Sequence, residues 1–112
     1  MEINNISEYL DQADALSRIG GNMSLYKRLL GRFVEGNAYS ELERAIQSGD
    51  MEEAARQAHS LKGVSANLSL TKIRSITVEL EQLVKDNADC SPCLAELKKA
   101  YDITVGIINE LQ

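Results

Sequence analysis

The sequence is poor in aromatic residues and proline and has no long apolar run. Its 112 residues include one phenylalanine, four tyrosines and no tryptophan, so leucine, isoleucine, valine and alanine must form the core, which favours packed helices over a β-sandwich. No stretch reaches the roughly 18 consecutive apolar residues of a membrane-spanning helix, and the first residues lack a basic and apolar signal sequence. We therefore expect an all-α, soluble, cytoplasmic domain without membrane insertion.

The chain is also too short and too acidic for several classes of protein. Its length fits one domain over residues 1–112 and excludes a multi-domain enzyme. Its 12 basic and 17 acidic residues give a net charge of −5, the wrong sign for binding nucleic acid. It has no glycine-rich phosphate cradle for ATP, so we expect no autonomous kinase activity.

The two cysteines, Cys90 and Cys93, are too close in sequence to form the disulfide framework of a secreted fold, which indicates a reducing compartment. A redox pair normally belongs to a βαβ setting, and a zinc site needs about four ligands. We interpret the pair as part of a helix-entry turn and expect neither a metal nor a cofactor in this chain. Any further role of the two thiols stays open.

Apolar residues recur at helical spacing, separated by glycines and capping residues. The predicted helices span about residues 10–19, 22–49, 50–68, 70–86 and 91–112. The predicted caps are Asn22, Asp50, Ser69 or Thr71, and Ser91. Two glycines, Gly31 and Gly36, allow a kink or break in the second helix. The pattern predicts an antiparallel four-helix bundle with a short extra N-terminal helix, and a monomer, because the bundle uses the one apolar seam of each helix.

The only histidine, His59, lies on the third predicted helix. At about 100° per residue the core face of this helix contains Ala54, Ala58, Leu61, Ser65 and Leu68. The histidine lies about 140° away from that direction, on the solvent side. Its own face carries Ala55, Lys62, Gly63 and Ala66, which are small apart from the lysine.

A glycine within a helix costs roughly 0.5–1 kcal/mol relative to alanine, and an exposed position offers no packing reason to accept that loss. Gly63 therefore indicates that a partner must approach closely, with Ala55 and Ala66 completing a shallow surface around His59. An ammonium at Lys62 disfavours imidazolium and attracts an incoming anion. The pattern favours a histidine nucleophile for phosphoryl transfer, with the metal and the leaving carboxylate supplied by the partner.

Charge along the chain points to the same partner. Residues 54–78 contain four basic residues and no acidic ones: Arg56, Lys62, Lys72 and Arg74. We expect a local positive patch that attracts a partner acidic around its active site. Lys72 and Arg74 are interpreted as solvated charges, and Glu81 as either a neighbour of the site or ordinary surface.

Residues 58–68, AHSLKGVSANL, resemble the phosphorylation motif of the histidine-containing phosphotransfer (HPt) domains of multistep two-component phosphorelays. The similarity extends to Ile19-Gly20-Gly21-Asn22 and the helix entry after it, and covers essentially the whole chain. It implies that His59 accepts a phosphoryl group from a receiver-domain aspartate and passes it to another receiver, that Lys62 stabilises the phosphohistidine, and that Gly63 admits the receiver.

The resemblance also implies its partners: response-regulator receiver domains, which would carry the magnesium ion, and a hybrid sensor histidine kinase. In one departure, Ser69 stands where the family usually has glycine, which implies a differently shaped turn. The alternative function is a non-catalytic helical adaptor, in which His59 and Lys62 are ordinary surface residues.

Overall fold

A computed structural model describes residues 6–112, which form helices and contain no strand. The helices are α1 (Ile6–Tyr9), α2 (Gln12–Arg18), α3 (Met23–Gly36), α4 (Ala38–Ser48), α5 (Met51–Asn67), α6 (Thr71–Lys85) and α7 (Ser91–Leu111). The all-α prediction is confirmed. None of these helices is both long and apolar enough to cross a membrane.

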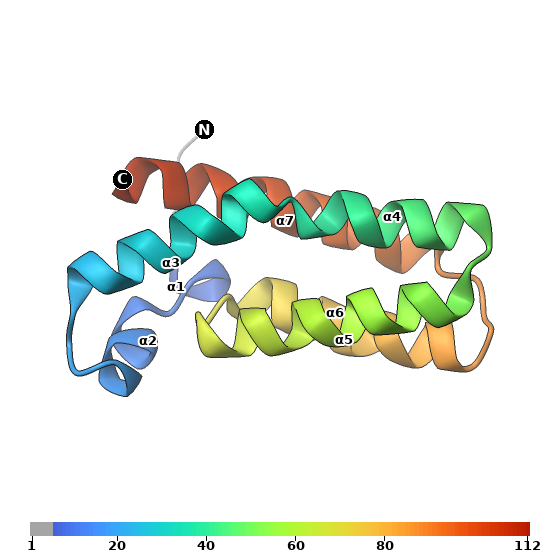
Figure 1. The fold of residues 1–112 in the computed structure, drawn as a ribbon, viewed down its shortest axis with the longest axis horizontal. Helices are drawn as coiled ribbons and strands as arrows, with labels where there is room; N and C mark the ends of the chain where they lie inside the picture. Colours follow the sequence, from blue (N-terminus) through green and yellow to red (C-terminus); the bar gives the residue numbers. More distant parts are fainter. Residues whose placement is uncertain (1–5) are drawn as a thin grey trace.

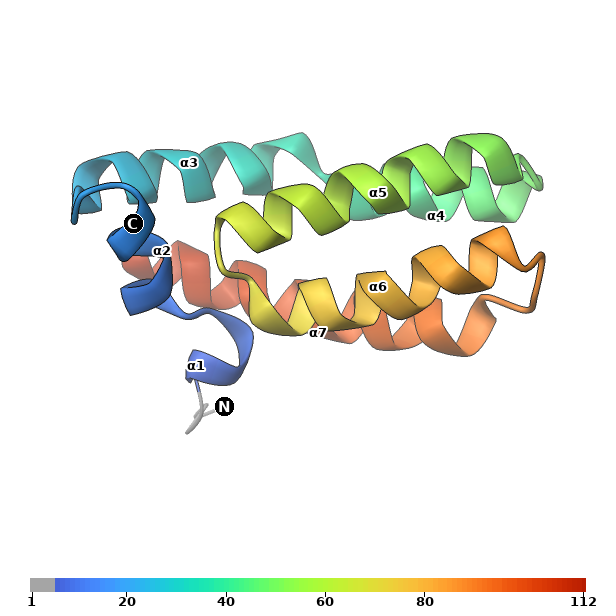
Figure 2. The same ribbon diagram turned by 90° about the horizontal axis from the view of Figure 1, so that it is seen from below.

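The long helices lie lengthwise beside one another, and their direction alternates along the chain (Figure 1). Helices α3 and α4 follow each other along one edge, α5 returns beside them, and α6 and α7 complete the set. Packing joins α5 to α4 and α6, and α7 to α3 and α6. Viewed from below, α1 and α2 lie at the end where α5 passes into α6 (Figure 2). The core lies between the long helices.

The N-terminal half contains more breaks than the sequence predicts. The short helix expected over residues 10–19 is confirmed as α2 but begins two residues later, and the sequence did not predict α1, from which the buried Leu10 separates it. The predicted weakness of the next helix is confirmed, and the break falls at Asn37, whose φ of 48° and ψ of 49° are left-handed. Asparagine tolerates this region better than most residues, and it directly follows Gly36.

Two of the predicted helix caps are confirmed. The side-chain oxygen of Asn22 accepts a hydrogen bond from the backbone N–H of Leu25 (3.0 Å), and that of Asp50 accepts one from Glu53 (3.1 Å). Each therefore satisfies a donor that the helix itself leaves unpaired.

The other two predicted caps are wrong. Helix α6 begins after Leu70, so neither Ser69 nor Thr71 caps it, and Thr71 instead donates its hydroxyl to the carbonyl oxygen of Glu8 (2.5 Å). Helix α7 begins at Ser91, whose backbone N–H donates to the Asp89 carboxylate (3.0 Å). The hydroxyl groups of Thr71 and Ser91 each belong to the first residue of their helix, one position too late to cap it.

The predicted core face of α5 is confirmed, since all five of its members are buried: Ala54, Ala58, Leu61, Ser65 and Leu68. Both cysteines are free and buried. Burial raises the pKa of the Cys93 thiol to about 11 and also raises the pKa of Cys90. Neither thiol presents a reactive thiolate at neutral pH.

The turn between α5 and α6 is built around Ser69, which is buried and has a left-handed φ of 55°. Its hydroxyl donates to the Asp14 carboxylate (2.7 Å) and accepts from the Arg18 guanidinium (2.5 Å). The same guanidinium donates to the carbonyl oxygens of Ala66 (2.8 Å) and Asn67 (2.9 Å) at the negative end of α5. These contacts fasten α2 to the end of the helix that carries His59.

This turn predicts opposite behaviour for two substitutions of Ser69. In Ser69→Ala the left-handed strain stays and the hydroxyl bonds are lost, so the free energy of unfolding falls by about 1–2 kcal/mol. In Ser69→Gly the same bonds are lost, but relief of the strain returns about 1–2 kcal/mol and leaves the stability near wild type. Urea unfolding measures both. A glycine variant less stable than the alanine variant would contradict this explanation.

Candidate functional site

His59 lies on the outer face of α5, where its side chain is 75% exposed. The predicted exposure is confirmed. One ring nitrogen, Nδ1, lies 3.2 Å from Oε2 of Glu81 on the neighbouring helix α6. The ring is therefore fixed from one side and open to solvent on the rest of its surface.

Glu81 is the residue that organises this site. Its side chain is only 8% exposed, and its second oxygen, Oε1, accepts a hydrogen bond from Nζ of Lys62 at 2.6 Å. One carboxylate between α5 and α6 thus contacts both the histidine and the lysine. Glu81 is a neighbour of the site and not ordinary surface, which decides the interpretation left open by the sequence.

Glu81 also determines which ring nitrogen carries the proton. The hydrogen bond from Lys62 holds the pKa of the Glu81 carboxyl below its ordinary value, with a smaller contribution from His59 and against the opposing effect of burial. An ionised carboxylate can only accept hydrogen bonds. The proton of the bond must therefore lie on Nδ1, and in the neutral imidazole this leaves the lone pair on Nε2.

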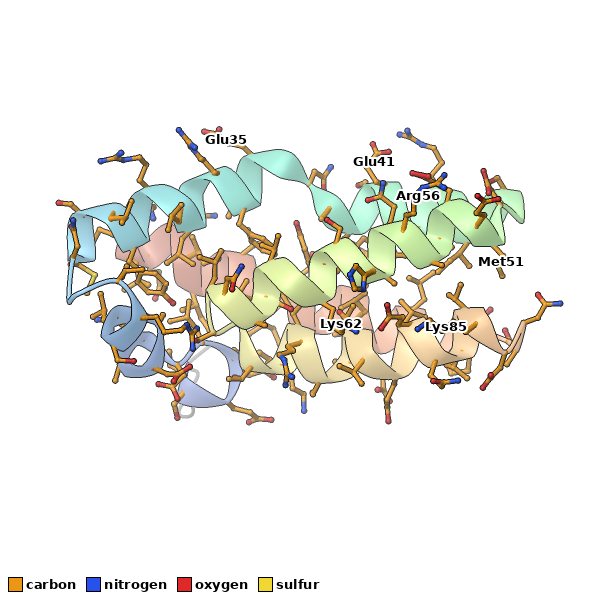
Figure 3. All side chains as sticks on the ribbon, turned by 60° about the horizontal axis from the view of Figure 1, so that its bottom comes forward. Glu35, Glu41, Met51, Arg56, Lys62 and Lys85 are labelled. Carbon is orange, nitrogen blue, oxygen red and sulfur yellow. The ribbon has the colours of Figure 1, made fainter. Side chains whose placement is uncertain are left out.

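Lys62 acts on this site together with Glu81. Its ammonium donates a hydrogen bond to the Glu81 carboxylate at 2.6 Å, so the two charges offset each other. Figure 3 shows Lys62 and Lys85 along the line where α5 and α6 meet. The ammonium is thus held by the same carboxylate that contacts the ring.

The predicted positive patch is wrong for the same reason. Acidic residues outside the segment 54–78 pair with its cations: Arg56 pairs with Glu52 and Glu53 of the same helix, and Lys72 pairs with Glu8 at 3.2 Å. Within residues 6–112 only Arg74 of the four basic residues has no ion pair. The partners of Arg56 lie three and four residues before it in the same helix, whereas the contact of Lys72 with Glu8 is tertiary and a charge count along the sequence does not detect it.

The small-residue face around His59 consists of Ala55, Gly63 and Ala66. Gly63 is exposed, and a Cβ atom built there would meet no atom within 4 Å. The two alanines are half-buried, and Ala55 packs against the core. The structure therefore leaves open space at Gly63, as the sequence predicted, while the alanines contribute less exposed surface.

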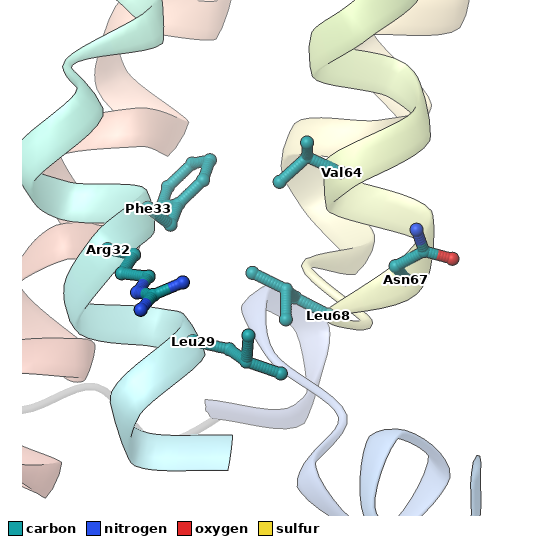
Figure 4. Close-up of a pocket in the computed structure, with 6 residues that line it drawn as sticks. All are labelled: Leu29, Arg32, Phe33, Val64, Asn67 and Leu68. Carbon is teal, nitrogen blue, oxygen red and sulfur yellow. The ribbon is translucent and has the colours of Figure 1, made fainter. Parts of the chain in front are cut away.

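An apolar groove that the sequence did not predict lies on the other side of Gly63, between α3 and α5 (Figure 4). It has a volume of about 400 Å³ and is lined by Leu29, Arg32, Phe33, Val64, Asn67 and Leu68. Val64, next to Gly63 in sequence, is 39% exposed. The pairing of α3 with α5 creates this groove, so no local pattern could have revealed it.

The contacts of His59 limit its chemistry. Among the described residues it has no hydrogen bond to a hydroxyl group, so it has no serine or threonine to activate. No group of three or more histidine, cysteine, aspartate or glutamate side chains in residues 6–112 could hold a metal ion. The arrangement instead resembles a nucleophile and the base that orients it, with the imidazole itself as the nucleophile.

The comparison with protein families supports a role for this region. Residues 36–104, more than half of the chain, match the family described as the Hpt domain. The matched segment contains His59, Lys62, Gly63 and Glu81. No curated protein and no solved structure matches the chain. The family match shows that the chain belongs to the Hpt domain family, whose role is phosphotransfer in two-component signalling.

Proposed function

We propose that this domain is a phosphorelay intermediate, in which His59 accepts a phosphoryl group from a receiver-domain aspartate and passes it to a second receiver. The observation that carries this proposal is the exposed imidazole whose Nδ1 faces the ionised Glu81, which leaves Nε2 as the nucleophile. The domain acts as a covalent carrier and not as an autonomous catalyst. A hybrid sensor histidine kinase and response-regulator receivers are the partners that fit this role.

The transfer requires few groups from this chain. The Nε2 lone pair attacks the phosphorus of the aspartyl phosphate, and the bond from phosphorus to the carboxylate oxygen breaks with its electron pair left on the aspartate. Nδ1 keeps its proton throughout, held by Glu81, and the second transfer reverses the sequence of bond changes. A magnesium ion on the receiver would offset the charge of the carboxylate.

The receiver must come close enough for in-line attack. Gly63 offers open space beside His59, with Ala55 and Ala66 flanking it, so a receiver loop can reach the imidazole without meeting a long side chain. In this proposal the lengthwise packing of α3–α4, α5, α6 and α7 is an antiparallel four-helix bundle carrying extra N-terminal helices. It acts as a cytoplasmic monomer that presents α5 as a rigid platform.

The first test is the transfer itself. Incubation with phosphorylated receiver domains should give the protein an acid-labile, base-stable label, and His59→Gln should carry none. The side chain is 75% exposed, so the variant should keep its fold by circular dichroism. Ser60→Ala, at the next exposed position, is the matched control and should be labelled. An adaptor would bind receivers without acquiring label, and label retained in His59→Gln would exclude this histidine as the acceptor.

The second test concerns Gly63. Gly63→Arg should fold and gain up to about 1 kcal/mol of stability, because an exposed mid-helix glycine is replaced by a good helix former. Phosphoryl transfer from receivers should nevertheless slow by on the order of 100-fold, because the long side chain displaces the reacting atoms. Gly63→Ala is the control: it should gain a similar amount of stability and should transfer the phosphoryl group much faster than Gly63→Arg. Equal transfer rates in wild type and Gly63→Arg would remove this reason for the glycine.

A further inference from the structure

The ammonium of Lys62 lies on the side of His59 where the phosphoryl group does not go. It contacts Oε1 of Glu81 at 2.6 Å, and the other oxygen of the same carboxylate faces Nδ1 at 3.2 Å. Under the proposed function, on which this inference rests, the phosphoryl group forms its bond to Nε2. The two ring nitrogens point in different directions, so the ammonium position that is best for Glu81 differs from the one that is best for the phosphoryl oxygens.

We infer that Glu81 and the phosphoryl group compete for Lys62, and that this competition weakens the hold of His59 on its phosphoryl group. When the group arrives, the ammonium moves from the carboxylate toward the phosphoryl oxygens. When the group leaves, the ion pair re-forms. Each uptake therefore costs the Lys62–Glu81 contact, which displaces the equilibrium toward release to the next receiver.

The direct effect of the Glu81 charge on the phosphorylated ring is smaller than the effect of losing the Lys62–Glu81 contact. The ring then carries a proton on Nδ1 and a phosphoryl group on Nε2, so the carboxylate attracts one end of the modified ring and repels the other. The two effects have opposite signs and largely cancel. Lys85 is the other cation near Glu81, and it acts on the carboxylate in both states. The exchange of Lys62 is the contribution that does not cancel.

The size of the effect follows from the exposure of the pair. Glu81 is 8% exposed and Lys62 is 32% exposed, so the contact is partly screened by solvent. Ion pairs of this kind shift an equilibrium by about twofold to fivefold. Glu81→Gln removes the charge that holds Lys62 and keeps an oxygen that can accept the Nδ1 proton. The variant should therefore bind the phosphoryl group about twofold to fivefold more favourably.

Phosphoramidate is a suitable phosphoryl donor because it requires no partner protein. Phosphoramidate that is protonated on nitrogen reacts: the phosphorus–nitrogen bond breaks as the bond to Nε2 forms, its electron pair stays on the nitrogen, and ammonia leaves without needing another proton. At a fixed ratio of phosphoramidate to ammonium, ³¹P NMR gives the ratio of phosphorylated to free His59. That ratio should rise about twofold to fivefold in Glu81→Gln. Glu79→Gln, an exposed charge removal on the same helix, should leave it unchanged.

A double-mutant cycle separates this competition from a merely structural effect. In a Lys62→Gln background the further change Glu81→Gln should give no increase, because no ammonium remains to be released. A gain that persists without Lys62 would overturn the inference, as would a folded Glu81→Gln variant with the wild-type ratio. Circular dichroism of each variant verifies its fold.

A measurement on the wild-type protein covers the case in which Glu81→Gln does not fold. The side-chain NMR signals of Lys62 and Glu81 should both shift when His59 is phosphorylated, and unchanged signals would overturn the competition. If His59 is phosphorylated but the ratio of phosphorylated to free His59 does not depend on Glu81, this inference alone is contradicted. Wild-type protein that takes up no phosphoryl group from phosphoramidate or from receivers would instead overturn the proposed function and the inference with it.

Discussion

The site depends on one carboxylate that is buried between two helices and shared by two partners. An ionised side chain that is only 8% exposed needs hydrogen-bond donors, and Glu81 has two, the ammonium of Lys62 and the N–H of His59. The same requirement fixes the ring. An exposed imidazole on a helix surface would otherwise rotate between rotamers, and the choice of protonated nitrogen would be left to solvent.

The rest of the fold holds that contact in place and keeps its surroundings open. Helices α5 and α6 pack closely along their length, and the Ser69 turn joins them in a left-handed conformation. Arg18 ties α2 to the last carbonyl groups of α5. A rigid α5 can then carry an exposed Gly63 despite the low helix propensity of glycine, because packing and not propensity stabilises this helix.

Sequence reasoning succeeded where the information is local. The helical period of α5 places Ala58 and Leu61 in the core and His59 in solvent, and the Asn22 and Asp50 caps depend only on residues three positions away. It failed where the information is tertiary. No period within α5 or α6 shows that Glu81 meets His59, or that Glu8 pairs with Lys72. The groove between α3 and α5 was missed for the same reason.

The most direct test of the central claim is the state of the two ring nitrogens of His59, measured by ¹⁵N NMR before and after phosphorylation. The Glu81 contact predicts that the neutral form of the ring carries its proton on Nδ1, and that the phosphorylated ring shows its phosphorus–nitrogen coupling on Nε2. A neutral ring protonated on Nε2, or a phosphoryl group on Nδ1, would contradict the claim that Glu81 selects the nucleophile.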